Sequence, residues 1–393
     1  MRKNRLDRLR CLAAFAEKGF WFMKKFYAII STLIILSLLL SGCGKKAEQP
    51  SGDISAAPTV SEPEPDKGNL NTLTGTYGTL DDSAVGKRPV AVMINNISTA
   101  QPVQTGLNKA DVVFECLVEG GISRLMAVFS DLSQCEKLGT IRSARYSYVQ
   151  LAKSLDAIYV HCGMDDTYTR PYAKEMPNFD FFDLGAQSDS LSMRIKIGLA
   201  YEHTLYIKGE TVESAVYDKY RNDISSDLSG KTLFNFAEEA GVPANGNECT
   251  SIKYYMSGDN YSTFKYDSET KKYRRLPFGK SQTDYFTDEA FEFDNVFVLY
   301  APTYDFSDGY HVHTDLDGGE GYYISSGLYK EIKWTKGDAS DRLKVFDVDG
   351  SELSVNPGTS FIAFPEKSLS NRTVIEPAPA PSEVSVADSS AND

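Results

Sequence analysis

Residues 111–130 read DVVFECLVEGGISRLMAVFS, in which two apolar runs are separated by a short segment with two glycines. A third apolar run, AIYVHC, follows at 157–162. Short runs rich in β-branched and aromatic residues, bounded by glycine or polar residues, are typical of buried strands. We therefore predict that three sheet strands form here and that the rest of the chain is organised around them.

The segment between the second and third predicted strands has the periodicity of a helix over 141–156. Its apolar residues recur three and four positions apart and so share one helix face; they are Ile141, Ala144, Tyr148, Leu151, Ala152 and Leu155. Arg142 and Arg145 lie three apart near the start of this helix, and Thr140 is a candidate N-cap. Two guanidinium groups and unpaired backbone N–H groups would face the same way, which favours anion binding.

Other polar residues follow predicted strands or turns. The run RPVAVMINN at 88–96 predicts a central strand that ends in two asparagines, and ligands of open α/β sheets gather at such ends. His203 lies in a polar loop and is the natural acid–base candidate. Turn formation by the asparagines and plain solvation of the histidine are the alternative interpretations. The candidate ligand-binding residues are Arg124, Arg142, Arg145, Asn95, Asn96, Glu119 and His203.

The N-terminal region of the sequence predicts that the protein is located outside the cytoplasm. A basic start, MKK at 23–25, is followed by an almost wholly apolar run at 26–40 and then by SGC, which ends at Cys43. This order is typical of a signal peptide with a lipobox, whose cysteine receives a lipid and becomes the mature N-terminus. The apolar run is about fifteen residues long, short of the roughly twenty that span a bilayer. Residues 1–42 are therefore interpreted as a signal peptide with an upstream extension.

The charge balance excludes nucleic acid as a partner. The chain has 41 Lys and Arg residues against 54 Asp and Glu residues, and residues 1–42 hold eight basic and two acidic ones. The remainder has 33 basic against 52 acidic residues, a formal charge of −19. So acidic a body repels phosphate backbones, although a local basic pocket around Arg142 and Arg145 remains compatible with it.

The fold class expected between the two ends of the chain is α+β, in two domains, because the length exceeds what one core usually serves. Residues 43–70, with the lipidated cysteine, are rich in Ser, Pro and Glu and predict a flexible tether. Residues 71–240 predict an α/β domain with a mixed sheet. Residues 241–366 contain short alternating strands and predict an antiparallel β domain, either a sandwich or a partly closed barrel. Residues 367–393 predict a disordered tail.

The cysteine and histidine patterns predict neither a metal site nor a cofactor. Four cysteines follow the lipobox without a C-x-x-C pair, namely Cys116, Cys135, Cys162 and Cys249. Cys116 and Cys162 lie in predicted strands, where they are either buried apolar residues or, if the strands are adjacent, a disulfide. His311 and His313 would share one face of a strand, but the spacing indicates no third or fourth metal ligand.

Several motifs together resemble the YerB-like lipoproteins. They are the lipobox, NTLTG at 71–75, RPVAVMINN at 88–96, ADVV at 110–113, EGGISR at 119–124, GTIRSAR at 139–145, GYY at 321–323, IKW at 332–334 and NPG at 356–358. The resemblance extends from Cys43 to about residue 366. It implies a bacterial lipoprotein with an α/β N-terminal part and a β-rich C-terminal part of unknown function, and it supplies no catalytic residues. EHT at 202–204 stands where PHN is common in the family, so that His203 still aligns.

Two kinds of function are expected. The first is a non-enzymatic module, tethered to the membrane by its lipid, that binds an anionic small molecule, an envelope polymer or a protein partner at the arginines. The alternative is a hydrolase or transferase acting on an envelope phosphodiester or glycan, with arginines stabilising negative charge and His203 or a carboxylate transferring protons. The candidate carboxylates, Asp111, Glu115 and Glu119, would share one strand face, where facing arginines satisfy them structurally. That ion-pair interpretation favours binding over catalysis.

Overall fold

The computed structural model describes residues 67–241, 243 and 245–377. The predicted signal peptide, Cys43, most of the tether and residues 378–393 lie outside the described residues. Within them, no helix is both long enough and apolar enough to cross a membrane.

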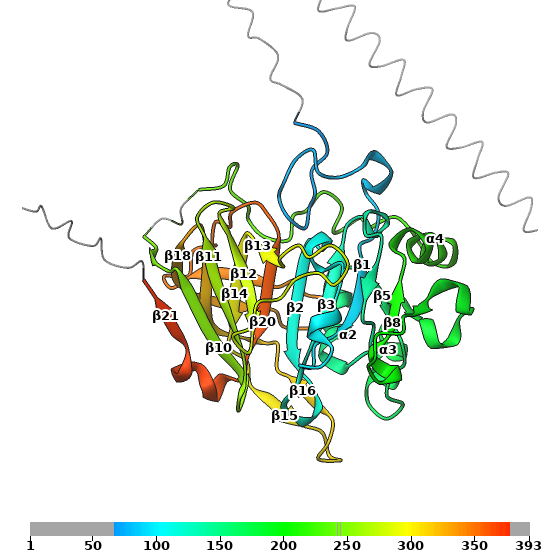
Figure 1. The fold of residues 1–393 in the computed structure, drawn as a ribbon. Coiled ribbons are helices and arrows are strands. Elements are labelled where there is room, and N and C mark those ends of the chain that lie inside the picture. Colours follow the sequence, from blue (N-terminus) through cyan, green and yellow to red (C-terminus); the bar gives the residue numbers. More distant parts are fainter. Residues whose placement is uncertain (1–66, 242, 244, 378–393) are drawn as a thin grey trace, which may run out of the picture. The chain divides into compact units, whose positions relative to one another are not determined.

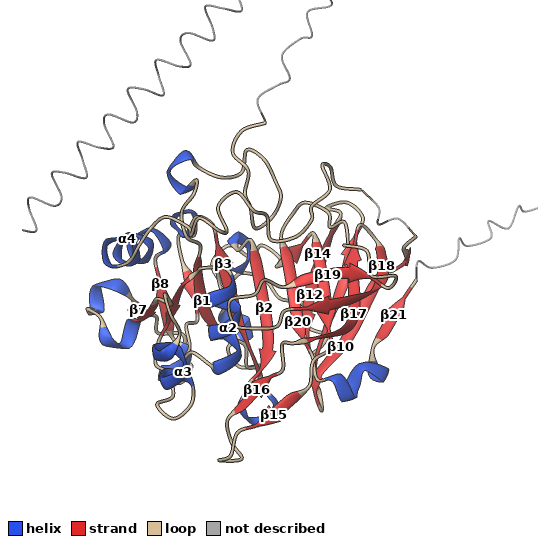
Figure 2. Cartoon of the chain, turned by 180° about the vertical axis from the view of Figure 1, so that it is seen from behind, coloured by secondary structure: helices blue, strands red, loops and turns tan. Residues whose placement is uncertain are grey.

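The described chain has the expected α+β fold, built on an eleven-stranded mixed sheet (Figures 1 and 2). Its order is β19-β18-β17-β14-β20-β2-β3-β1-β5-β6, and β9 pairs with β18. The strands are β1 (Val90–Asn95), β2 (Val112–Leu117), β3 (Ser123–Phe129), β5 (Ile158–His161), β6 (Phe181–Asp183), β9 (Asn247–Glu248), β14 (Asn295–Leu299), β17 (Gly318–Ser325), β18 (Leu328–Thr335), β19 (Lys344–Asp347) and β20 (Ser360–Phe364).

Three smaller sheets and three α-helices complete the described strands and α-helices. A five-stranded sheet has the order β13 (Glu292–Phe293), β12 (Lys272–Pro277), β11 (Asn260–Asp267), β10 (Ser251–Ser257) and β21 (Val374–Glu376). The others are the hairpin β15 (Thr303–Asp305) with β16 (Val312–Thr314), and the sheet of β4 (Leu138–Gly139), β8 (Leu205–Ile207) and β7 (Met193–Arg194). The helices are α2 (Tyr146–Ser154), α3 (Thr169–Glu175) and α4 (Gly209–Lys219).

The three strands predicted around 111–162 form as β2, β3 and β5, and the strand predicted at 88–96 forms as β1. β1 and β2 are both antiparallel to β3, which lies between them. β5 and β6 run parallel to β1, and β20 and β14 run parallel to β2. Strands β1, β2, β5, β6, β14 and β20 therefore end at the same edge of the sheet, which we call the carboxyl edge. The β15–β16 hairpin lies there, beyond the end of β2 (Figures 1 and 2).

The two faces of the large sheet bury different partners. Alternate residues of β1 such as Val92 belong to the core that also contains Ile252 and Phe264 of the five-stranded sheet. Their neighbours, such as Met93, belong to the core on the opposite face, which contains Leu151 of α2. Because side chains alternate along a strand, one apolar run supplies both cores.

Helix α2 begins five residues later than the periodicity predicted. Residues 140–144 are instead inserted at the carboxyl edge between β1 and β5. The N–H of Arg142 donates to the Met93 carbonyl (3.0 Å), and the Arg142 carbonyl accepts from the N–H of Cys162 (3.1 Å). Ile141 and Ala144 are buried by this extended backbone, so their burial did not require a helix. Arg145, not Thr140, occupies the N-cap position.

The prediction of a disordered tail from residue 367 was wrong for residues 367–377. Residues Lys367–Arg372 form the 3-10 helix η9, and the following β21 pairs with β10, where Ile375 packs against the core. Two apolar residues at 374–375 suffice to add an edge strand to an existing sheet.

Candidate functional site

Three arginines and one glutamate meet at the carboxyl edge, and we call them the arginine cluster: Arg124, Arg142, Arg145 and Glu119. Arg124 lies at the start of β3, and Arg145 lies at the N-cap of α2. Arg142 is part of the inserted segment, and Glu119 begins the 3-10 helix η4 (Glu119–Gly121). The arginine cluster therefore depends on residues 140–144, which lie between the ends of β1 and β5.

Glu119 and Arg145 form a buried ion pair. The Arg145 Nε contacts Glu119 Oε1, and the side chains are 16% and 6% exposed, respectively. The Arg145 Nη1 also donates to the Ala144 carbonyl (2.8 Å). This pairing holds the side chain against the sheet rather than in solvent.

Arg124 differs from the other members of the arginine cluster, because it is only 4% exposed and forms no ion pair among the described residues. Its Nη1 donates to the Ser143 carbonyl. Burial and the nearby Arg145 lower the pKa of Arg124 to about 9, while Glu119 opposes that shift. The group remains a cation at neutral pH and lacks a carboxylate of its own.

Arg142 lies at the more open side of the cluster. Its Nη1 donates to the Glu202 carbonyl (3.3 Å), whereas its Nε is buried without a hydrogen-bond partner. Burial lowers the pKa of Arg142, and the nearby Glu202 carboxylate offsets only part of that shift. The cluster thus holds more guanidinium charge than Glu119 and the exposed Glu202 neutralise.

Asn95 and His203 are brought to the same edge. The Asn95 amide nitrogen is 2.9 Å from His203 Nδ1, so the ring accepts at Nδ1. His203 is 8% exposed, in the 3-10 helix η8 (Tyr201–His203), so it is not the solvated loop residue that we considered. Burial, followed by the charge of Arg142, lowers its pKa.

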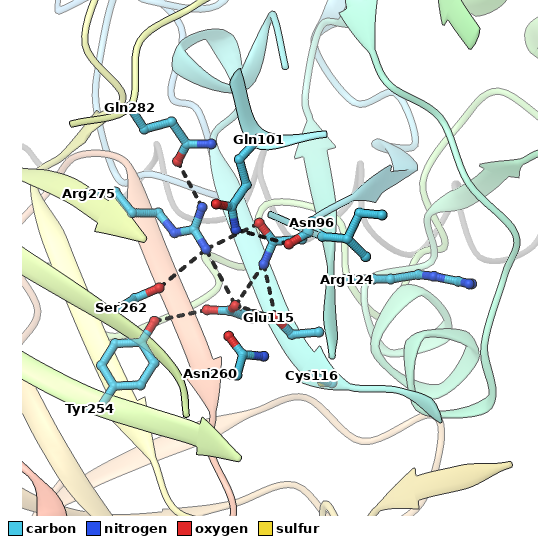
Figure 3. Close-up of polar contacts among 12 residues, drawn as sticks. Asn96, Gln101, Glu115, Cys116, Arg124, Tyr254, Asn260, Ser262, Arg275 and Gln282 are labelled. Atoms are coloured by element: carbon cyan, nitrogen blue, oxygen red, sulfur yellow. Dashed lines mark hydrogen bonds and ion pairs between the residues drawn. The ribbon is translucent and has the colours of Figure 1, made fainter. Parts of the chain in front are cut away.

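Asn96, in contrast, is not part of the arginine cluster. Its side chain points to the other face of the sheet and donates to Glu115 Oε1 (2.9 Å) and Ser123 Oγ (2.9 Å) (Figure 3). Arg124 extends away from this network in the same view. The prediction that both asparagines share one site was wrong because consecutive residues of an extended chain face opposite ways.

The network around Asn96 joins the two large sheets of the described chain. Glu115 accepts from the Tyr254 hydroxyl (2.9 Å) and lies 3.4 Å from Arg275 Nη2. Arg275 Nη1 also donates to Gln282 Oε1 (2.8 Å). The Glu115 and Arg275 side chains are each 1% exposed, so this network is structural.

The predicted row of acidic residues is dispersed. Asp111, at the opposite end of β2, accepts from Asn71 Nδ2 (2.8 Å) and from the N–H of Ser130. Glu115 faces the five-stranded sheet, and Glu119 pairs with Arg145. Strand parity did not place Glu119, which lies in η4 beyond the end of β2, and each of the three carboxylates has a different partner.

His311 is a residue of this edge that was considered only for metal binding. Its Nε2 lies 3.9 Å from Glu119 Oε1, and its Nδ1 lies 2.6 Å from Asp308 Oδ2. The ring of His313 instead packs 4.8 Å from that of Phe306. Among the described residues, no three His, Cys, Asp or Glu side chains form a group that could hold a metal ion. The aromatic and histidine residues of 304–313 were the sequence feature that could have indicated a role for this segment at the site.

The described cysteines are free thiols. Cys116 is fully buried on β2, whereas Cys162 is partly exposed just after β5. Burial is the main cause that raises the pKa of both thiols, which makes them poor nucleophiles.

Two family models match the chain. The N-terminal domain of "Protein of unknown function (DUF3048)" matches residues 73–222, and the C-terminal domain of the same family matches residues 251–362. A curated protein named "Putative lipoprotein YerB", from Bacillus subtilis (strain 168), is 28% identical over 347 residues, which cover 86% of this chain and 95% of that protein.

A solved structure agrees with these matches. The crystal structure of the YerB protein from Bacillus subtilis is similar with a TM-score of 0.66 and 26% sequence identity, over 78% of this chain and 99% of that one. With both DUF3048 domains present in order and the same fold, the chain belongs to the YerB-like family.

Proposed function

We propose that this protein is a lipoprotein, held to the membrane outside the cytoplasm by a lipid on Cys43, that binds an anionic ligand at the arginine cluster. The lipobox sequence and the name of the Bacillus relative, "Putative lipoprotein YerB", support the anchor. The observation that carries the binding proposal is Arg124, a buried guanidinium without a carboxylate of its own.

A buried charge is costly unless an opposite charge accompanies it. Arg124 and Arg145 share Glu119, and Arg142 adds a third cation with a buried, unpartnered Nε. A phosphate or carboxylate placed among them would accept several charge-assisted hydrogen bonds, for which guanidinium geometry is suited. The carboxyl ends of parallel strands are also where open α/β sheets bind ligands.

The contacts favour this binding function over the hydrolase or transferase alternative. Glu119 is engaged by Arg145, and Glu115 lies on the other face of the sheet. His203 remains the candidate for proton transfer beside the arginines, but its Nδ1 is occupied by Asn95.

Ligand-induced thermal shifts test the site. We expect inorganic phosphate, pyrophosphate and citrate to stabilise the purified protein, and Arg142→Ala with Arg145→Ala to weaken their affinity about tenfold or more, as lost charge-assisted hydrogen bonds predict. Lys174→Ala with Lys208→Ala is a control that removes the same charge from exposed positions. Equal shifts in the arginine variant and the wild type, for every anion, would remove the site.

Cell fractionation tests the anchor. Cys43→Ser removes the thiol that would carry the lipid, whereas the wild type keeps its lipid and stays with the membrane. The variant is expected either as a processed protein in the soluble extracytoplasmic fraction or as a precursor that keeps its signal peptide. Cys135→Ser, at a buried cysteine of the described chain, serves as the control. Membrane retention of the Cys43→Ser protein after processing would contradict the lipid anchor.

A further inference from the structure

An exposed aromatic hairpin lies beside the arginine cluster. We define it by five residues on and between β15 and β16, which are Tyr304, Phe306, Tyr310, His311 and His313. Figure 1 shows this hairpin at the carboxyl edge, next to the end of β2. Tyr304 and Tyr310 are 49% and 62% exposed, so two tyrosine rings face solvent on an otherwise acidic protein.

The aromatic hairpin is fixed against the body by packing. Phe306 stacks on Tyr168, with 4.1 Å between the ring centroids, and meets Tyr146 edge-on at 5.2 Å. The N–H of Thr314 donates to Ser147 Oγ (2.9 Å). These contacts order the hairpin, so its exposed rings are presented in a defined position.

Two short routes connect the exposed rings with the arginine cluster. The ring of Tyr310 is 5.1 Å from that of His311, whose Nε2 lies 3.9 Å from Glu119. The ring of Tyr304 is 5.8 Å from that of His313, which in turn lies 5.9 Å from Tyr146, the neighbour of Arg145 in the chain. Chains of side-chain contacts therefore link the exposed rings of the aromatic hairpin to the arginine cluster.

We propose that the aromatic hairpin and the arginine cluster together bind a carbohydrate chain bearing anionic groups. This inference rests on the anion-binding function proposed above and names the class of its ligand. The C–H faces of a sugar ring pack on aromatic rings, while phosphates or carboxylates on the chain reach the arginines. A single small anion reaches the arginines alone, whereas an extended ligand also contacts the exposed tyrosines. Tyrosine supplies such contact area at a low cost in conformational entropy.

Calorimetric titration of the full-length protein, with four probes, tests this proposal. The probes are inorganic phosphate, a hexamer of galacturonic acid, an N-acetylated and C-amidated hexamer of glutamic acid with the same number of carboxylates, and the neutral sugar maltohexaose. We expect the galacturonate to bind about tenfold more tightly than the acidic peptide, as one or two aromatic contacts predict. Tyr304→Ala with Tyr310→Ala should remove that preference and leave phosphate affinity unchanged.

Two further variants serve as controls. Tyr77→Ala with Tyr285→Ala alters tyrosines that are 49% and 43% exposed and that contact Lys67 and Phe286 instead, and it should bind like the wild type. Tyr304→Phe with Tyr310→Phe keeps both rings and should retain the preference, which separates ring stacking from misfolding.

The outcomes distinguish this inference from the proposed function. Arginine-dependent phosphate binding together with equal affinities for galacturonate and acidic peptide would overturn the carbohydrate class and leave the anion site standing. An unchanged preference in Tyr304→Ala with Tyr310→Ala would also overturn it. Anion binding that ignores Arg142→Ala with Arg145→Ala would reject the proposed function itself.

Discussion

Arg275→Met is expected to lower the free energy of unfolding by about 3–5 kcal/mol, because it leaves a buried carboxylate without its cation. The Arg275 Nη2 lies 3.4 Å from Glu115, 3.3 Å from Asn96 and 3.3 Å from Ser262. Its guanidinium also lies 5.2 Å from the ring centroid of Phe361. Urea denaturation, followed by circular dichroism, measures the loss.

The neighbouring residue provides a matched control. Arg274 is on the opposite face of β12, with a side chain that is 49% exposed, and it pairs with Glu292. Arg274→Met should change stability by no more than about 1 kcal/mol, since exposed ion pairs contribute little. Glu115→Gln combined with Arg275→Met should recover part of the loss, because it removes the unpaired charge. Equal losses in both arginine variants would show that the buried network does not join the sheets as argued.

Glu119→Gln is expected to raise the affinity for inorganic phosphate about tenfold while lowering the free energy of unfolding by about 2–3 kcal/mol. Glu119 accepts from Arg145 and is the near anion of Arg124, so it competes with any ligand for these cations. Removing its charge frees the guanidinium groups for the ligand, but the ligand-free protein then holds Arg124 and Arg145 without their nearby carboxylate.

Calorimetric titration and urea denaturation measure the two effects separately. The matched control is Glu202→Gln, because Glu202 is nearby but has a side chain that is 53% exposed. That variant should change both quantities only slightly, since solvent screens its charge. Weaker phosphate binding in Glu119→Gln would mean that Glu119 assists the ligand rather than competes with it.

Part of this fold could be predicted because its signals are local. The apolar runs at 111–130 and 157–162 form β2, β3 and β5, since their β propensity and flanking residues require no distant partner. The α+β class and the family followed from the same kind of local pattern. Helix α2 was predicted, but its start was not. Burial of Ile141 and Ala144 fits both a helix face and an inserted extended segment, and hydrogen bonds to Met93 and Cys162 decide between them.

The sequence by itself determined strands β1, β2, β3 and β5, the presence of helix α2 and the residue types available for anion binding, because each depends on neighbours within a few positions. Only the tertiary structure decided which of those residues meet. Glu115 and Arg275 are 160 positions apart, and β2 pairs with β20 from the far end of the chain. The aromatic hairpin reaches the arginine cluster in the same way. Such contacts form because burial of the two sheet faces brings distant segments together, and no local pattern records that pairing.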